Sequence, residues 1–117
     1  MYKFSHRDSG CLLSILDSID KINSYTKIFK SADEFYKNTI SFDATMMNFI
    51  VIGEMAEKLS DEFRKSTASE IDWYKIKGFR NIIAHNYFGI DAEEVWQIMK
   101  DSLPDLKEKI VKITEQK

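Results

Sequence analysis

The amino-acid sequence predicts an all-α protein, an up-down four-helix bundle with one additional short helix, in a single domain spanning residues 1–117. The chain has four glycines and one proline among 117 residues, too few for a turn-rich β fold. Apolar residues recur three and four positions apart along most of the chain, which is the period of an amphipathic helix. Short polar stretches with helix-capping residues divide this pattern into five helical segments.

The first predicted helix runs from about Asp8 to Phe29. One side of it carries the apolar residues Leu12, Ile15, Leu16, Ile19, Ile22 and Phe29. A short second helix is expected to begin after Ser31 and to continue through Tyr36. Ser31 and Glu34 have the capping-box spacing, in which a serine and a glutamate three residues later satisfy free backbone donors.

A long third helix is predicted from Phe42 to about Arg64, with Ser41 as its N-cap. Its apolar stripe consists of Phe42, Met46, Phe49, Gly53, Ala56 and Phe63, with Met47, Val51, Met55 and Leu59 beside it. Gly53 and Ala56 are small, so another helix can approach closely at this point.

The fourth helix is expected from about Asp72 to Asn86, after a loop at 66–70. Gly89 interrupts the helical pattern, as glycine often does at the end of a helix. The core-facing arc of this helix comprises Ile76, Phe79, Ile82 and Ile83.

The last helix is expected to open at Asp91, which reads as an N-cap followed by acidic first-turn residues. Its apolar side carries Val95, Ile98, Met99, Leu103, Leu106, Ile110 and Ile113. Pro104 should kink this helix, because proline lacks a backbone donor and crowds the preceding turn.

The charge balance argues against a nucleic-acid protein of the extended, strongly basic kind. The net charge is −2, with 31% charged and 44% apolar residues. One segment differs: residues 73–90 contain Lys75, Lys77 and Arg80 and no acidic residue. This basic strip fits a site for a single anionic group, and the two lysines are explained equally well by a solvated helix face.

The cysteine and histidine content predicts neither a disulfide nor a metal site. Cys11 is the single cysteine, so no internal disulfide can form. His6, His85 and Cys11 lack any zinc-ligand spacing, and no cofactor is expected. We find no secretory signal and no apolar run long enough to span a membrane, which favours a cytoplasmic protein.

The polar residues of the fourth helix are the main candidates for function. Arg80, Asn81, His85 and Tyr87 lie on its non-core side. Arg80 and His85 are roughly 140° apart on an ideal helix, so they would flank a bound group or meet across a subunit interface. Five methionines and eight phenylalanines are many for so small a bundle, which favours a homodimer over a monomer whose core they simply fill.

Four segments of the chain together carry a family pattern: Ile52–Ser60 (IGEMAEKLS), Ile71–Asn81 (IDWYKIKGFRN), Ala84–Asp91 (AHNYFGID) and Leu103–Leu106 (LPDL). They resemble the HEPN superfamily, and within it the HepT-like toxins. The superfamily signature is an arginine followed four to six residues later by a histidine, and the HepT-like refinement adds a tyrosine two residues on. The chain departs from the family pattern at Asp72, where proline is common, and at Met55, where a small residue is common.

The resemblance implies a metal-independent endoribonuclease that works as a dimer and belongs to a type VII-like toxin–antitoxin system. Its signature residues here are Arg80 and His85. It also implies an antitoxin partner, an MntA-like nucleotidyltransferase that neutralises the toxin by transferring AMP to the motif tyrosine, Tyr87. Glu54 and Asn81 are expected to support the site, Glu54 as a partner of Arg80.

The chemistry of RNA cleavage fits these residue types. An imidazole titrates near neutral pH and can take the proton of a 2′-hydroxyl or return one to the leaving oxygen. A guanidinium stays charged and binds phosphate oxygens with paired donors. The expected product of 2′-hydroxyl attack is a 2′,3′-cyclic phosphate.

Other interpretations remain open for each residue. Arg80 could serve only to pair with a carboxylate such as Glu54, and His85 could be a structural histidine. Asn81 could fix the tautomer of His85 or cap a turn, and Tyr87 could be an interface aromatic. The chain could then be a non-catalytic helical module that binds a nucleotide or a nucleotidyltransferase, or a structural dimer that supports one.

Overall fold

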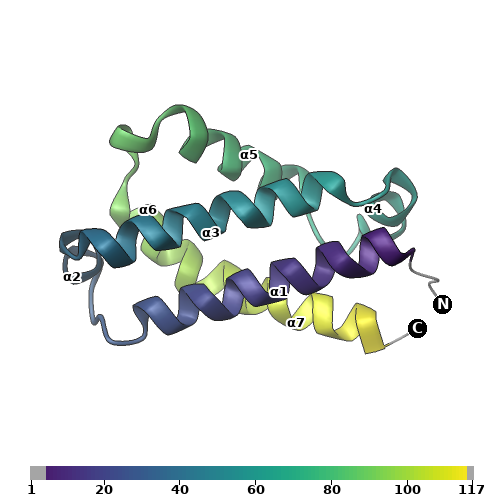
Figure 1. Ribbon diagram of the computed structural model, residues 1–117, viewed down its shortest axis with the longest axis horizontal. Helices are drawn as coiled ribbons and strands as arrows, with labels where there is room; N and C mark the ends of the chain where they lie inside the picture. The colour runs from purple at the N-terminus through teal and green to yellow at the C-terminus, as the bar shows by residue number, and fades with distance from the viewer. Residues whose placement is uncertain (1–4, 116–117) are drawn as a thin grey trace.

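The computed structural model describes residues 5–115, which form helices joined by short turns, and no strand occurs within that range (Figure 1). The helices are α1 (His6–Thr26), α2 (Ala32–Lys37), α3 (Thr39–Lys58), α4 (Asp61–Thr67), α5 (Trp73–His85), α6 (Ala92–Gln97) and α7 (Leu103–Glu115). A 3₁₀ turn, η1 (Tyr87–Gly89), follows α5, and a π-helical turn, η2 (Ile98–Ser102), joins α6 to α7. The predicted all-α fold is therefore confirmed.

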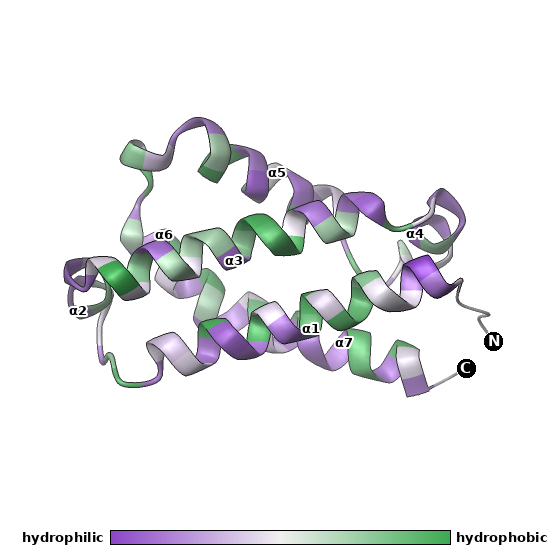
Figure 2. Cartoon of the chain, viewed as in Figure 1, coloured by the Kyte–Doolittle hydropathy of each residue, from purple (hydrophilic) through white to green (hydrophobic). Residues whose placement is uncertain are grey.

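The long helices run up and down around a shared core. In Figure 1, α3 lies between α1 and α5, and α7 lies beside α1 on the other side of the bundle. The core is made of side chains from every long helix, among them Ile15, Ile19, Met46, Ile83 and Ile110, each no more than 1% exposed. Burying one such side chain contributes ~1.5–3 kcal/mol. Figure 2 shows hydrophobic and hydrophilic residues interleaved along each helix, as expected when one face of each is buried.

Two helix starts lie where polar capping residues predicted them. Ser31 accepts a hydrogen bond from the Glu34 amide at 3.2 Å, and Asp91 caps α6 in the same way. Asp72, the expected first residue of the fourth helix, caps α5 by accepting from the Lys75 amide. The predicted cap at Ser41 is wrong, because Asn38 caps α3 by accepting from the Ser41 amide at 3.0 Å. The first helix also ends earlier than predicted, at Thr26.

The predicted long helix to Arg64 is in fact two helices. The chain turns extended at Leu59 (φ −60°, ψ 148°), and Ser60 caps α4 by accepting from the Phe63 amide at 3.1 Å. Asp8 of α1 stabilises this break, since its carboxylate accepts from both the Ser60 amide and the Ser60 hydroxyl at 2.7 Å. The serine and the two acidic residues after it form an N-terminal signature that the apolar stripe concealed.

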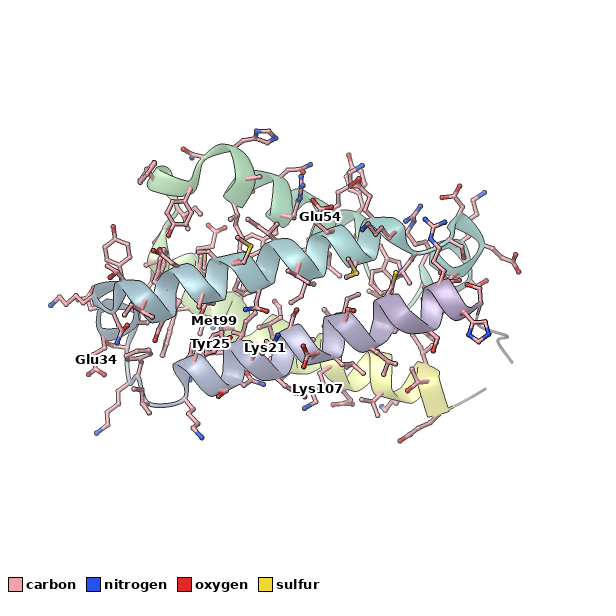
Figure 3. All side chains as sticks on the ribbon, viewed as in Figure 1. Lys21, Tyr25, Glu34, Glu54, Met99 and Lys107 are labelled. Carbon is pink, nitrogen blue, oxygen red and sulfur yellow. The ribbon has the colours of Figure 1, made fainter. Side chains whose placement is uncertain are left out.

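The last helix accommodates Pro104 without ending. The Leu103 amide donates to the Ile98 carbonyl, a bond that spans five residues in place of the usual four. Pro104 was expected to kink the helix because it lacks a backbone donor. The irregularity lies in the turn just before the proline, which is π-helical. Lys107, three residues further on, reaches Asp20 of α1 at 2.8 Å (Figure 3).

Candidate active site

The helix that carries the candidate residues, α5, packs mainly on α3. Trp73 anchors its start, donating from its ring nitrogen to the Thr67 hydroxyl at 2.8 Å. Phe79 packs edge-on against Phe49 of α3, with ring centroids 5.1 Å apart. Of the four residues predicted to face the core, Ile83 is 1% exposed, whereas Ile82 is 51% exposed. The core face is thus narrower than predicted, because α5 lies at the edge of the bundle (Figure 1).

Arg80 crosses α3 at Gly53. A Cβ atom on Gly53 would lie 2.3 Å from Arg80 Cβ and 2.5 Å from its Cγ, so only glycine leaves room for this side chain. Ala56 and Gly53 are both buried, as the close approach predicted from their size requires.

The guanidinium of Arg80 is held by two neighbours. Its Nη2 donates to the Glu54 carboxylate, which lies on the side of α3 facing α5 (Figure 3), and its Nη1 donates to Asn81 Oδ1 at 3.1 Å. The Arg80 side chain is 27% exposed and that of Glu54 is 41% exposed. Arg80 Nε is buried without a hydrogen-bond partner among residues 5–115. A guanidinium has five donors, so this one retains unused hydrogen-bonding capacity.

The basic strip predicted on this helix is faced by carboxylates of α3. Besides the Arg80–Glu54 pair, Lys77 lies 3.9 Å from Glu57, one turn along α3. Exposed pairs of this kind are worth up to about 1 kcal/mol each and exchange readily with other ions. An anionic ligand that binds this strip therefore has to compete with Glu54 and Glu57 for Arg80 and Lys77.

His85 is the last residue of α5 and its side chain is exposed. Its imidazole has no hydrogen-bond partner within the part of the chain that the structure describes. The carbonyl oxygen of Asn81 accepts from Arg80, and no hydrogen bond joins Asn81 to His85 among the described residues. As far as residues 5–115 are concerned, both ring nitrogens of His85 are therefore available to a ligand or a partner.

Tyr87 begins the 3₁₀ turn after α5, and its hydroxyl donates a hydrogen bond to the Asp43 carboxylate of α3. Burial, the bond to Asp43 and the charge of Asp43 raise the pKa of Tyr87 to about 12. Gly89 ends this turn without positive φ, so it is no left-handed helix cap. A Cβ there would lie 2.6 Å from Asn86 Oδ1, so the exposed Asn86 side chain would have to turn aside to admit it.

Asp43 was not among the predicted site residues. It lies 44 positions before Tyr87, next to Phe42, and no spacing rule links the two. Only the packing of the 3₁₀ turn over the start of α3 brings them together.

We also searched the described residues for a metal site, a membrane-spanning helix and a hollow near Arg80 and His85. Within residues 5–115, no three His, Cys, Asp or Glu side chains are grouped so that they could hold a metal ion. No helix in that range is long and apolar enough to cross a membrane. A hollow of about 570 Å³ between α5, α3 and the π-helical turn is lined by Phe49, Ile76, Phe79 and Leu103 among others, and contains neither Arg80 nor His85.

Comparison with known proteins assigns the chain to a family. The family model described as "Ribonuclease HepT-like" matches residues 15–113, which include Arg80, His85 and Tyr87. The chain belongs to the HepT-like ribonuclease family. The resemblance to the HEPN superfamily drawn from the sequence segments is thereby confirmed.

Two curated relatives match this HepT-like chain over nearly its whole length. "Putative RNase MJ1380" of Methanocaldococcus jannaschii is 32% identical over 107 residues, covering 91% of this chain and 96% of the relative. "Probable ribonuclease HepT" of Thermococcus cleftensis is 29% identical over 111 residues, covering 95% and 97%.

A third relative is longer than this HepT-like chain. "Gamma-glutamylcyclotransferase and putative RNase MJ0434" of M. jannaschii is 37% identical over 102 residues, which are 87% of this chain but 45% of the relative. The chain thus spans less than half of that protein. No solved structure gives a significant match.

Proposed function

We propose that this chain is a metal-independent endoribonuclease in which Arg80 and His85 carry the reaction. The main support is that both residues lie on α5, the helix at the edge of the bundle. His85 is exposed and unpartnered within residues 5–115, and the guanidinium of Arg80 is partly exposed with donors to spare. The names of the curated relatives point to the same activity for those proteins.

The proposed reaction uses the nucleophile that RNA itself provides. The His85 imidazole takes the proton of a 2′-hydroxyl as its oxygen forms a bond to the adjacent phosphorus. Arg80 turns from Glu54 to the phosphate and stabilises the charge that develops on it. A second imidazole protonates the 5′-oxygen as its bond to phosphorus breaks, which leaves a 2′,3′-cyclic phosphate end.

The second imidazole would come from a second copy of the chain. Ile82 and His85 are three residues apart on α5 and therefore share a face. Ile82 is 51% exposed, and Phe88 beyond the end of the helix is 99% exposed. Burying these apolar side chains against their symmetry mates would bring the two His85 imidazoles toward one cleft.

The dimer is tested by mass measurement in solution. Ile82→Ser combined with Phe88→Ser should yield monomers by size-exclusion chromatography with light scattering. Leu13→Ser on α1 is the matched control, since Leu13 is 64% exposed on a helix away from this face. A dimer that survives the double substitution places the interface elsewhere.

We further propose that the chain is the toxin of a type VII-like toxin–antitoxin system, restrained by an MntA-like nucleotidyltransferase that transfers AMP to Tyr87. Tyr87 lies two residues beyond His85, in the segment that resembles the family. A bound AMP there would add bulk and negative charge beside the place where substrate phosphate binds. Expression of the chain should arrest growth unless the nucleotidyltransferase is present, and His85→Ala should abolish the arrest.

The ribonuclease is tested with purified protein, shown by mass to be unmodified, and total RNA in EDTA. The parent chain should cleave RNA and leave cyclic-phosphate ends, whereas Arg80→Ala and His85→Ala should not. Ends with a 5′-phosphate and a free 3′-hydroxyl would contradict the mechanism. Absence of cleavage by a folded, dimeric parent chain would favour the alternative, a non-catalytic module that binds a nucleotide or the nucleotidyltransferase.

A further inference from the structure

The contact between Tyr87 and Asp43 stands out among the side-chain contacts at this edge of the bundle. The Tyr87 hydroxyl points at the Asp43 carboxylate and donates to it. Asp43 is exposed, and no cation lies within ion-pair distance of it among the residues that the structure describes. The carboxylate therefore has one evident protein partner, the tyrosine hydroxyl, and none of the ribonuclease chemistry requires it.

The ring of Tyr87 has aromatic contacts as well. It packs against Phe42, with centroids 6.1 Å apart, and against Phe88 at 5.4 Å. Phe42 is 6% exposed and directly precedes Asp43, so consecutive residues of α3 locate the ring and the hydroxyl. The backbone bond from the Gly89 amide to the Asn86 carbonyl, at 3.0 Å, closes the turn that carries Tyr87.

A phenol held in this way is a poor nucleophile until its proton is removed. At neutral pH the Tyr87 hydroxyl is protonated, since burial and the nearby carboxylate both disfavour the phenolate. Its proton already lies on the hydrogen bond to Asp43. A base at hydrogen-bonding distance from the proton that it removes is the geometric requirement for general-base catalysis.

We propose that Asp43 is the base that accepts the Tyr87 proton when that hydroxyl is nucleotidylated, so that the chain supplies a catalytic group to its own modification. This inference rests on the proposed transfer of AMP to Tyr87. The phenolic oxygen forms a bond to the α-phosphorus of a nucleoside triphosphate bound by the nucleotidyltransferase. The bond from that phosphorus to the bridging oxygen breaks, pyrophosphate leaves, and the proton passes to the Asp43 carboxylate.

The role in proton transfer is separable from a role in holding the ring. Asp43→Asn keeps an oxygen that can accept the hydrogen bond but cannot take up the proton at neutral pH. Asp43→Ala removes both functions. Because Asp43 is exposed, neither substitution should unfold the bundle, which circular dichroism checks.

The test is the initial rate at which the purified chain gains one nucleoside monophosphate, measured by intact mass with an MntA-like nucleotidyltransferase, ATP and Mg²⁺. Asp43→Asn should slow the transfer by about a hundredfold, within the usual range for loss of a general base. Its rate should rise with pH across the neutral range, where that of the parent chain is flat. Tyr87→Phe should gain no mass, and Asp17→Asn, an exposed carboxylate on α1, should match the parent chain.

The possible failures are distinct. If the parent chain gains no mass, the proposed restraint by AMP transfer fails, and the inference about Asp43 falls with it. If the parent chain is modified and Asp43→Asn is modified as fast, Asp43 is no base. If Asp43→Asn is slow but keeps the flat pH profile of the parent chain, Asp43 only positions the ring and the proposed proton transfer is overturned.

Discussion

The Arg80 side chain lies across Gly53 so closely that a methyl group on the glycine would be 2.3 Å from Arg80 Cβ. This contact explains why the guanidinium reaches Glu54, the residue next to Gly53 on α3. A helix-weakening glycine in the middle of α3 costs about 0.5–1 kcal/mol relative to alanine. In return, the missing side chain of Gly53 leaves the space in which the Arg80 side chain crosses α3.

Gly53→Ala should therefore impair activity. The added methyl group must displace Arg80 or push α5 away from α3, and a displacement of about 1 Å at a catalytic group can cost about a hundredfold in rate. RNA cleavage should fall by that order while the protein stays helical. Steady-state cleavage of a labelled RNA, together with thermal unfolding, measures both effects.

Gly10→Ala is the control for that experiment. Gly10 also lies inside a long helix, α1, and a Cβ there meets nothing within 4 Å. It should leave cleavage unchanged and raise stability by about 0.5–1 kcal/mol. Equal cleavage by Gly53→Ala and Gly10→Ala would show that the position of Arg80 against α3 does not matter to the reaction.

Glu54→Gln should tighten RNA binding. The carboxylate pairs with Arg80 and repels phosphate, whereas an amide of the same shape can still accept from the guanidinium. Measured in a His85→Ala background, which prevents cleavage, the Kd for RNA should fall by about fivefold at low salt, equivalent to about 1 kcal/mol. The gain should shrink as salt is added. Weaker binding would mean that Glu54 positions Arg80 for RNA and does not compete with it.

Sequence periodicity was sufficient for the fold class. Apolar spacing located the long helices, and polar capping residues located helix starts at Ser31 and Asp91. It failed where two signals overlapped. The apolar stripe of α3 continues in phase to Phe63, so the break at Ser60 was hidden, and what stabilises that break, Asp8, lies 52 residues away.

The sequence predicted the spacing of the site residues along one helix, but not all of their contacts with other helices. The motif gave Arg80, His85 and Tyr87 their spacing, and Glu54 was named as a partner of Arg80, a contact that is present. The partner of Tyr87 was missed, because pairing a residue of α3 with a turn after α5 depends on how the two pack. The roles of these residues in catalysis and modification remain predictions.

Asp8→Ala should destabilise the bundle by about 3 kcal/mol. Asp8 is 4% exposed, and its carboxylate accepts two hydrogen bonds from Ser60 at the junction of α3 and α4. Hydrogen bonds to a charged group contribute about 1.5–3 kcal/mol each, and the Ser60 amide would lose its acceptor. Urea unfolding measures the loss. Asp17→Ala, which removes only an exposed pair with Lys21, should cost less than about 0.5 kcal/mol.

Tyr87 should make the fold sensitive to alkali. A folded-state pKa of about 12, against an ordinary value of 10.0, means that the folded chain holds the phenolic proton at pH values where the unfolded chain has lost it. Stability from this group is therefore complete below pH 10 and declines as pH rises through the interval to about 12. Over that interval the parent chain should lose more stability than Tyr87→Phe.

The same titration separates the causes of the raised pKa. The tyrosinate absorbance that the parent chain shows and Tyr87→Phe lacks should develop late in an alkaline titration. In Asp43→Asn it should develop at lower pH, because the nearby negative charge is gone. It should not return to the ordinary value, because burial of Tyr87 is the largest cause of the shift and persists in that variant. An unchanged titration in Asp43→Asn would mean that the hydroxyl does not donate to Asp43 in solution, and the proposed base would lose its geometric support.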